Sequence, residues 1–286
     1  MFDWIASSLR LATPLLFAAM GGLLCERAGI ATICLEGVML VAAFTAAATT
    51  FYFGNPWVGM CAGLLAGMIA MLLHAFLSVT AKSDRIISAV AINILAAGMT
   101  PFLCKVFFTS ATNTAALSME NRLPAFPIMA LALILPFIVN YFLKRTSWGM
   151  WLSSAGDGPK ALETCGIPVS RVRYAALAAG GLLTSLGGIY LATCHASQFT
   201  RDMTAGRGFI ALAALIFGKW KPIPTLFACL FFGLTDSLQI QLQSVTFQGF
   251  EVPVQLLQAL PYLITLFVLV GFVGEAKPPA AILKNE

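Results

Sequence analysis

The sequence predicts an all-α fold: a polytopic membrane helix bundle of about nine spans, within a range of eight to ten. Of its 286 residues, 59% are hydrophobic and 10% are charged, whereas soluble domains carry about a quarter charged residues. Long apolar runs recur along the whole chain, each close to the roughly 20 residues that a helix needs to cross a bilayer. No polar stretch is long enough for a soluble domain, so residues 1–286 are expected to form a single transmembrane domain.

The apolar runs define the expected spans in chain order. They cover residues 5–24, 29–51, 57–79, 86–108, 127–143, 174–194, 200–218, 222–240 and 253–273. The first run has no basic leader and no small-residue cleavage site after it, so we expect it to remain as a span. The seven cysteines include no C-x-x-C pair, which favours buried core thiols over a metal or redox role.

Small residues at four-residue spacing predict close helix packing. Such positions occur in the third and sixth expected spans, at Gly59, Gly63 and Gly67 and at Gly180, Thr184 and Gly188. Small side chains let two backbones approach closely in lipid, where no hydrophobic force drives helices together. A simple excess of glycine in membrane spans is the alternative explanation.

The basic residues predict the orientation. If the loop 144–173 is cytoplasmic, 12 of the 17 Lys and Arg residues lie on the cytoplasmic side. The exceptions are Lys105, Arg122, Arg201 and Arg207 near the outer side, and Arg10 within the first span. Cytoplasmic loops of membrane proteins carry such an excess of positive charge. The N-terminus is therefore expected outside and the C-terminus in the cytoplasm.

The seventh segment is too short to cross as one regular helix. The apolar run between Arg207 and Lys219 covers about 15 Å as a helix, half of the roughly 30 Å hydrocarbon core. Polar backbone at membrane depth is tolerated only inside protein or beside water. One broken or half-span helix is therefore expected near 200–218, with its N-terminus, at about Thr204 to Arg207, facing a central vestibule. An outer loop followed by a tilted short helix remains the alternative.

Polar residues within the expected spans are candidates for a translocation path or substrate contact. They are Glu36, Ser88, Asn93, Thr204, Arg207, Asp236 and Gln239. A charge near the bilayer centre costs at least ~2.5–3.5 kcal/mol, so such side chains usually face the bundle interior or a pore. Glu36 either lines a path or ties helices together, and Gln239 either contacts a solute or reaches outer water. His74 and His195 are isolated and are expected to be packed or interfacial.

The stretch GDGPKALETCGI, residues 156–167, predicts a capped two-turn helix in the largest basic loop. Asp157 or Gly158 serves as the N-cap, Pro159 occupies the first helical position and Gly166 ends the helix. Lys160 and Glu163 can pair on one face, while Ala161, Leu162 and Cys165 make a small apolar face. A helix this short needs the fold or a partner to hold it. Docking to a separate ATPase and resting on its own bundle are the two interpretations.

Five motifs in order resemble the permease subunits of ATP-binding-cassette (ABC) importers. They are ATPLLFAAMGGLLCERAGIATICLEGVMLVAA, INILAAGMT, GDGPKALETCGIPVSRVRY, TAGRGFIALAALIFGKW and LPYLITLFVLVGFVG. They are similar to the branched-chain amino acid, ribose and nucleoside permease family, in particular its nucleoside-type branch. The resemblance runs from about residue 10 to 280 and implies a multi-pass protein of the bacterial cytoplasmic (inner) membrane.

The resemblance also implies partners. These are a second permease subunit (identical or different), a cytoplasmic ABC ATPase and an extracytoplasmic, lipid-anchored substrate-binding protein. The implied cargo is a purine or pyrimidine nucleoside, with riboflavin or a sugar as further candidates. By the same resemblance, the residues that couple to the ATPase are Asp157, Pro159, Lys160, Ala161, Leu162, Glu163 and Gly166.

The chain itself is not expected to be an enzyme. The phosphate-binding pattern G-x-x-x-x-G-K-[ST] is missing, because Gly218-Lys219 is followed by Trp220. We therefore expect no cofactor on this chain, with ATP and Mg used by the partner ATPase. An ion-gradient-driven secondary transporter of a small polar solute is the alternative, because such transporters also use broken helices and intramembrane carboxylates.

Overall fold

The computed structural model describes residues 2–243 and 278–283, and this part of the chain is helical. Within these described residues, seven helices are long and apolar enough to cross a membrane. They are α1 (Phe2–Arg27), α2 (Leu35–Phe53), α3 (Pro56–Ala75), α4 (Arg85–Phe108), α5 (Ala125–Arg145), α8 (Val169–Ile189) and α10 (Pro222–Leu242). π-Helical turns extend two of them, Phe76–Thr80 after α3 and Tyr190–His195 after α8. The expected span 253–273 lies outside the described residues.

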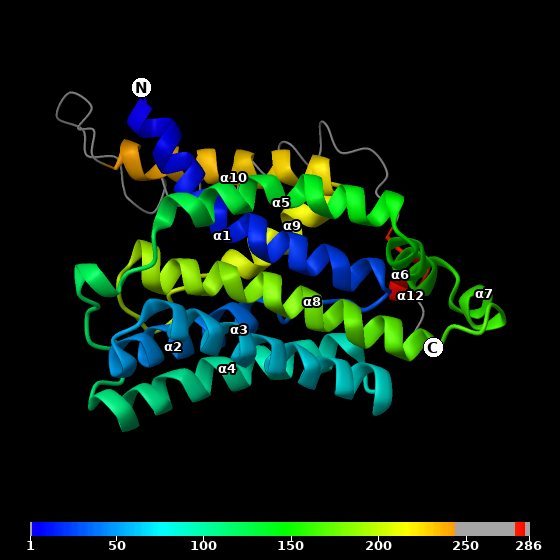
Figure 1. Cartoon of the computed structure of the whole chain (residues 1–286), viewed down its shortest axis with the longest axis horizontal. Coiled ribbons are helices and arrows are strands. Elements are labelled where there is room, and N and C mark those ends of the chain that lie inside the picture. Colours follow the sequence, from blue (N-terminus) through cyan, green and yellow to red (C-terminus); the bar gives the residue numbers. More distant parts are fainter. Residues whose placement is uncertain (1, 244–277, 284–286) are drawn as a thin grey trace.

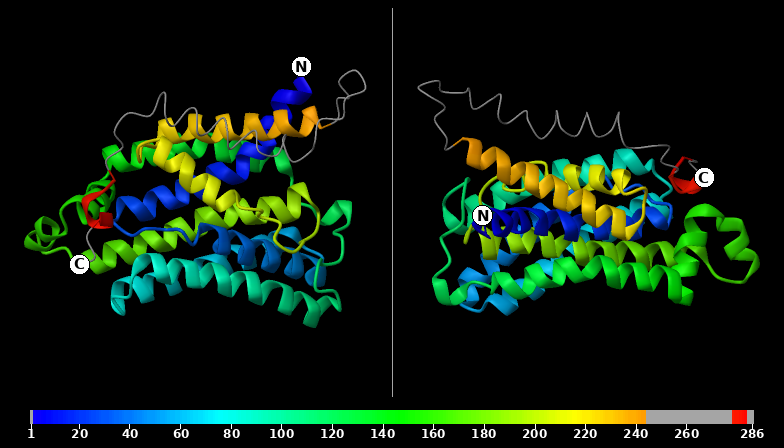
Figure 2. Two further views of the ribbon diagram at one scale, coloured as in Figure 1. Left: turned by 180° about the vertical axis from the view of Figure 1, so that it is seen from behind. Right: turned by 90° about the horizontal axis from the view of Figure 1, so that it is seen from above.

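The shorter helices lie between and beside these spans. They are a 3-10 turn (Met119–Asn121), α6 (Ser147–Asp157), α7 (Pro159–Thr164), α9 (Arg207–Phe217) and α12 (Ala280–Leu283). Helices α1 and α8 pack against each other through the middle of the bundle, with α10 and α5 on one side and α2, α3 and α4 on the other (Figures 1 and 2). Helices α6, α7 and α12 gather at one end, opposite the start of α1 (Figure 1). We call these the α7 end and the N-terminal end.

Small residues bring the central helices together, as the sequence predicts. A Cβ atom on Gly63 of α3 would lie 2.9 Å from the carbonyl oxygen of Ala42 in α2. A Cβ atom on Gly180 of α8 would lie 2.7 Å from the carbonyl oxygen of Gly21 in α1. Real Cβ atoms do not approach other atoms this closely, so both positions require glycine. The glycine pattern therefore marks true helix–helix contacts.

The expected second span, 29–51, is wrong at its start, because residues 28–34 are irregular and α2 begins at Leu35. Gly29 takes a φ of +86°, which turns the chain away from α1. Side chains of other helices then bind the freed carbonyl oxygens of Ala31 and Ile33. Helix α2 is therefore short: its 19 residues span about 28 Å, against about 39 Å for the 26 residues of α1.

The segment 200–218 contains the short helix that the sequence predicts, and α9 covers 11 residues or about 16 Å. The chain before it is a loop that pairs with the α4–α5 connection. The Thr114 amide donates to Phe199 O at 3.0 Å, and the Arg201 amide donates to Thr112 O at 2.6 Å. The polar residues of FTRDMTAG therefore lie ahead of the helix rather than within it.

The loop 144–173 carries two helices where the sequence analysis expected one. Helix α6 begins after Thr146, whose hydroxyl accepts a hydrogen bond from the Gly149 amide at 3.1 Å. Leu152 and Ala155 of α6 are buried in the main core. Helix α8 also begins earlier than expected, at Val169 rather than residue 174. The α7 end is consequently a compact helical unit.

Candidate functional site

The starts of α2 and α9 meet inside the bundle, and Glu36 joins them. Glu36 is the second residue of α2 and points at the first turn of α9. The Gly206 amide donates to Oε1 at 2.8 Å, and the Gly208 amide donates to Oε2 at 2.6 Å. The positive end of the α9 dipole adds to these charge-assisted hydrogen bonds. Glu36 therefore caps the short helix from another element.

Two glycines make this junction sterically feasible. Gly206 precedes α9 with a φ of +82°, a left-handed conformation that favours glycine. A Cβ atom on Gly208 would lie 2.5 Å from the Glu36 amide nitrogen. Helix α9 thus rests directly on the backbone of α2. We call Glu36, Gly206 and Gly208 the helix junction.

Asn93 of α4 secures the other side of the same junction. Its Oδ1 accepts from the Gly37 amide at 2.8 Å, and its Nδ2 donates to Ile33 O at 3.0 Å. One amide side chain thereby satisfies the first turn of α2 and the irregular segment before it. Ser88, one and a half turns earlier on α4, instead contacts His74 Nδ1 at 3.0 Å. His74 is buried and reaches Ala31 O through Nε2 at 3.0 Å, as expected for a packed histidine.

The remaining candidates gather toward the N-terminal end. Thr204 is buried, and Arg207 donates from Nη1 to Met203 O at 3.1 Å. Asp236 and Gln239 lie half-buried on α10. The charge of Arg207 acts on Asp236 and also on His195.

Sequence reasoning missed two members of this polar cluster. Arg10 of α1 and His195 are both exposed, and the charge of Arg10 acts on His195. Gly233 of α10 packs against Ser8 O, because a Cβ atom there would come within 2.7 Å, so this part of α10 lies on the start of α1. The outer cluster is defined here as Arg10, His195, Arg207 and Asp236. The lone charge within the first apolar run was the signal that pointed to Arg10.

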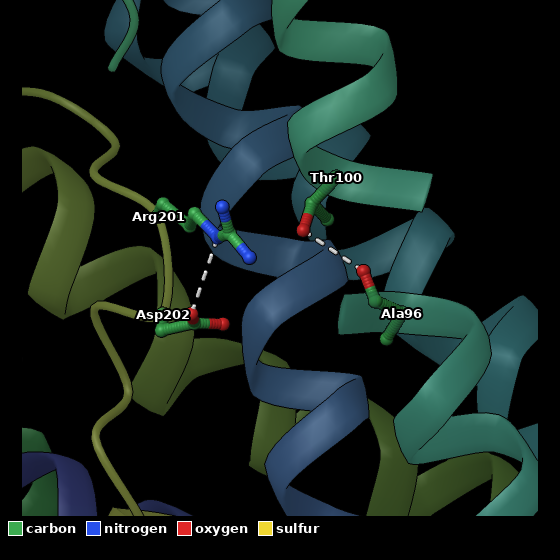
Figure 3. A network of polar contacts seen from close by, with 4 residues as sticks. All are labelled: Ala96, Thr100, Arg201 and Asp202. Carbon is green, nitrogen blue, oxygen red and sulfur yellow. Dashed lines mark hydrogen bonds and ion pairs between the residues drawn. The ribbon is translucent and has the colours of Figure 1, made fainter. Parts of the chain in front are cut away.

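Arg201 and Asp202 form an exposed ion pair with each other. Figure 3 shows their ion pair in the loop before α9, near the Thr100 hydroxyl that donates to Ala96 O within α4. The Arg201 Nε to Asp202 Oδ2 distance is 3.4 Å, with side chains 61% and 63% exposed. An exposed pair of this kind adds little stability.

The predicted start and end of the short helix α7 are confirmed, whereas its predicted apolar face is corrected. Gly158 is the N-cap, Pro159 is the first helical residue, and Gly166 follows the helix with a φ of +77°. Leu162 is buried at 4% exposure, whereas Ala161 and Cys165 are exposed, so the predicted apolar face of these three residues is wrong. Leu162 holds α7 to the core, while Lys160, Ala161 and Glu163 are exposed.

Another carboxylate, which is buried and which sequence reasoning did not single out, holds the far end of α9. Glu26 near the end of α1 accepts from Trp220 Nε1 at 2.6 Å, just beyond α9. Arg27 donates from Nε to Trp220 O at 2.9 Å. Helix α9 is therefore fixed at its start by Glu36 and after its end by Glu26. Within the described residues, no three His, Cys, Asp or Glu side chains come together to hold a metal.

The long apolar helices of the described residues indicate an integral membrane protein, and a half-length helix inside the bundle is a feature that many transporters share. The family model described as "Branched-chain amino acid transport system / permease component" matches residues 4–270. The chain belongs to this permease family.

Three relatives show how far the similarity extends. The guanosine ABC transporter permease protein NupQ of Bacillus subtilis is 35% identical over 97% of this chain and 94% of its own length. The nucleoside ABC transporter permease protein NupC of Lactococcus lactis is 34% identical over the same shares. The putative glucose ABC transporter permease protein TsgC13 of Haloferax volcanii is 32% identical over 84% of this chain and 78% of its own.

Proposed function

We propose that this chain is the membrane-spanning permease subunit of an ABC importer for nucleosides. The observation that carries the proposal is the similarity to NupQ and NupC along 97% of the chain. The chain works with a cytoplasmic ABC ATPase, a second permease subunit and an extracytoplasmic substrate-binding protein. ATP and Mg act in the ATPase. TsgC13 has a different named solute, so nucleoside preference needs its own test.

The translocation path runs beside α9, between the helix junction and the outer cluster. Broken helices whose ends meet inside a bundle are a common design for solute sites in transporters. Arg207 and Asp236 offer donors and acceptors that suit the hydroxyls and ring nitrogens of a nucleoside. Thr204 and Gln239 add polar groups on the same two elements. Glu36, Asn93 and Ser88 position the helices that form the wall.

Helix α7 receives the force of the ATPase. Its residues Lys160, Ala161 and Glu163 are exposed, and Asp157 is exposed just before it. Leu162 transmits movement of α7 to the core in which it is buried. Clustering of Arg27, Arg85 and Arg173 around residues 28, 29 and 220 supports a cytoplasmic location for this end.

Uptake by the complete importer tests the proposal. The chain is reconstituted in proteoliposomes with its ATPase, second permease and binding protein, and entry of labelled guanosine is measured. We expect uptake to require ATP and to persist in the presence of an ionophore, with guanosine displacing label far better than glucose. Uptake that collapses with the ionophore and ignores ATP would identify a secondary transporter instead.

A further inference from the structure

The last turn of α1 lies between two parts of the protein that are distant in sequence, the end of α6 and the chain just after α9. Arg27, the last residue of α1, contacts both. Its carbonyl oxygen is so close to Gly156 of α6 that a Cβ atom at position 156 would overlap with it. Its side chain donates from Nε to Trp220 O at 2.9 Å. One residue therefore bridges the α7 end and α9.

The contact between α1 and α6 leaves no space to absorb movement. Gly156 lies shortly before Pro159, the first residue of α7. A Cβ atom on Gly29, just after α1, would lie 3.2 Å from the Cα atom of Gly156, so backbone meets backbone here as well. Close-packed groups transmit a displacement because they have low compressibility. A shift of α6 and α7 must therefore shift the end of α1.

Trp220 connects the end of α1 to α9. Its side chain is buried, and Nε1 donates to Glu26 Oε2 at 2.6 Å, so two successive residues of α1, Glu26 and Arg27, hold it. The Trp220 amide donates to Leu215 O, in the last turn of α9, at 3.2 Å. Trp220 is therefore fixed to α9 through its amide and to α1 through its side chain and carbonyl group.

The connections at both ends of α9 hold residues in a strained conformation. After the helix, Lys219 and Trp220 both have a φ of +53°. Before it, Asp202 and Ala205 have φ values of +53° and +46°. Residues other than glycine rarely adopt this left-handed conformation, which persists where the surrounding contacts impose it. Connections that absorb changes of φ and ψ allow an element to move as a unit, and α9 has such connections on both sides.

We propose that Arg27 and Glu26 are positioning residues that transmit the movement of α6 and α7 to α9. Pressure of the ATPase on α7 displaces Gly156, and Gly156 displaces Arg27. The hydrogen bonds from α1 to Trp220 then carry the displacement into α9. Because α9 borders the proposed translocation path, this route changes the path from the α7 end. The inference rests on the proposed function, since it requires an ATPase that acts on α7.

The ratio of substrate uptake to ATP hydrolysis in the complete importer tests this route. Both rates are measured in the same proteoliposomes for the wild type, Arg27→Met and Arg27→Lys. Methionine cannot donate a hydrogen bond, so Arg27→Met is expected to lower the ratio about fivefold or more, with ATP hydrolysis nearly unchanged. Lysine can still donate to Trp220 O, so Arg27→Lys should restore most of the ratio. Lys221→Met is the matched control, because it removes an exposed positive charge next to Trp220 and spares the contacts of Arg27.

The wild-type importer separates this inference from the proposed function. Absence of ATP-dependent uptake by the wild type would refute the proposed function, whereas wild-type uptake with an unchanged ratio in Arg27→Met would refute the route alone. A parallel fall of both rates in Arg27→Met would also overturn the route, because it would show a purely structural role. An equal loss of the ratio in Lys221→Met would do the same by showing a general effect of charge.

A double variant decides the question if Arg27→Met does not fold. Glu26→Gln together with Trp220→Phe removes the indole donor and also the buried charge that accepts from it. Removing both partners of a hydrogen bond is far less costly than leaving one buried and unpaired. The double variant should therefore fold and lose the ratio in the same way as Arg27→Met. A ratio equal to that of the wild type would contradict the proposal.

Discussion

Glu36 shows that a single residue can join two distant helices in this protein. Its sequence position marked it as either a path residue or an interhelical tie. The hydrogen bonds to Gly206 and Gly208 give it a defined structural task, 170 residues away along the chain. No local pattern could predict that partner, because the contact depends on how α2 and α9 pack.

Replacing the Glu36 carboxylate by an amide tests this task. Glu36→Gln keeps the size of the side chain but replaces one charged acceptor by an N–H₂ donor facing backbone N–H groups. Hydrogen bonds to charged groups contribute about 1.5–3 kcal/mol, so we expect a loss of that order in the free energy of unfolding. A lower melting temperature in detergent and reduced uptake should follow. Glu120→Gln, at an exposed turn, should change neither; an unaltered Glu36→Gln protein would refute the cap.

A pair of glycine substitutions tests the closeness of α9 and α2. Gly208→Ala places a methyl group 2.6 Å from the Glu36 Cα atom, so α9 must shift and the protein should lose stability. Gly98→Ala on α4 meets nothing within 4 Å and should be neutral or stabilise by up to about 1 kcal/mol. The melting temperatures of the two variants are measured in the same detergent and compared with that of the wild type. Similar effects from the two changes would mean that helix propensity, and not the contact, controls position 208.

At the scale of elements, the sequence predicted long regular helices well and irregular backbone poorly. Periodic apolar runs located α3, α4 and α10 within a few residues, because lipid demands continuous helix. Residues 28–34 were predicted to start a span because they are apolar. Hydrogen bonds from the side chains of His74 and Asn93 instead stabilise this segment in an irregular conformation. Helix α6 was missed because half of SWGMWLSSAGD is polar or glycine and its burial depends on α1 and α5.

Helix α7 separates a structural face from a docking face, and substitutions should separate their effects. Leu162→Ala removes a buried side chain and should cost about 2–5 kcal/mol of stability. Lys160→Ala and Glu163→Ala alter exposed positions and should leave the melting temperature unchanged. In proteoliposomes, these two variants should hydrolyse ATP with little substrate uptake. Normal uptake in the double variant would place the ATPase contact elsewhere.

At the scale of the whole molecule, the polar residues around α9 explain why the function was harder to predict than the fold. Composition and hydropathy determine the class of protein, and one half-length helix follows from a single short apolar run. The outer cluster takes Arg10, His195, Arg207 and Asp236 from four different elements, so no local sequence pattern could reveal it. The candidates on α2 and α4 proved to be tied into hydrogen bonds, which shifts the proposed path toward α9 and α10.

Orientation in the membrane is the property on which every cytoplasmic assignment depends, and the native cysteines can report it. Cys165 is exposed at the end of α7, whereas Cys61 is exposed within the apolar α3, where lipid excludes polar reagents. A membrane-impermeant maleimide should therefore label the wild-type chain in inside-out vesicles and leave it unlabelled in intact cells. Cys165→Ser should abolish the labelling. Strong labelling of Cys165 in intact cells would reverse the topology, place α7 beyond the reach of a cytoplasmic ATPase and remove the coupling role.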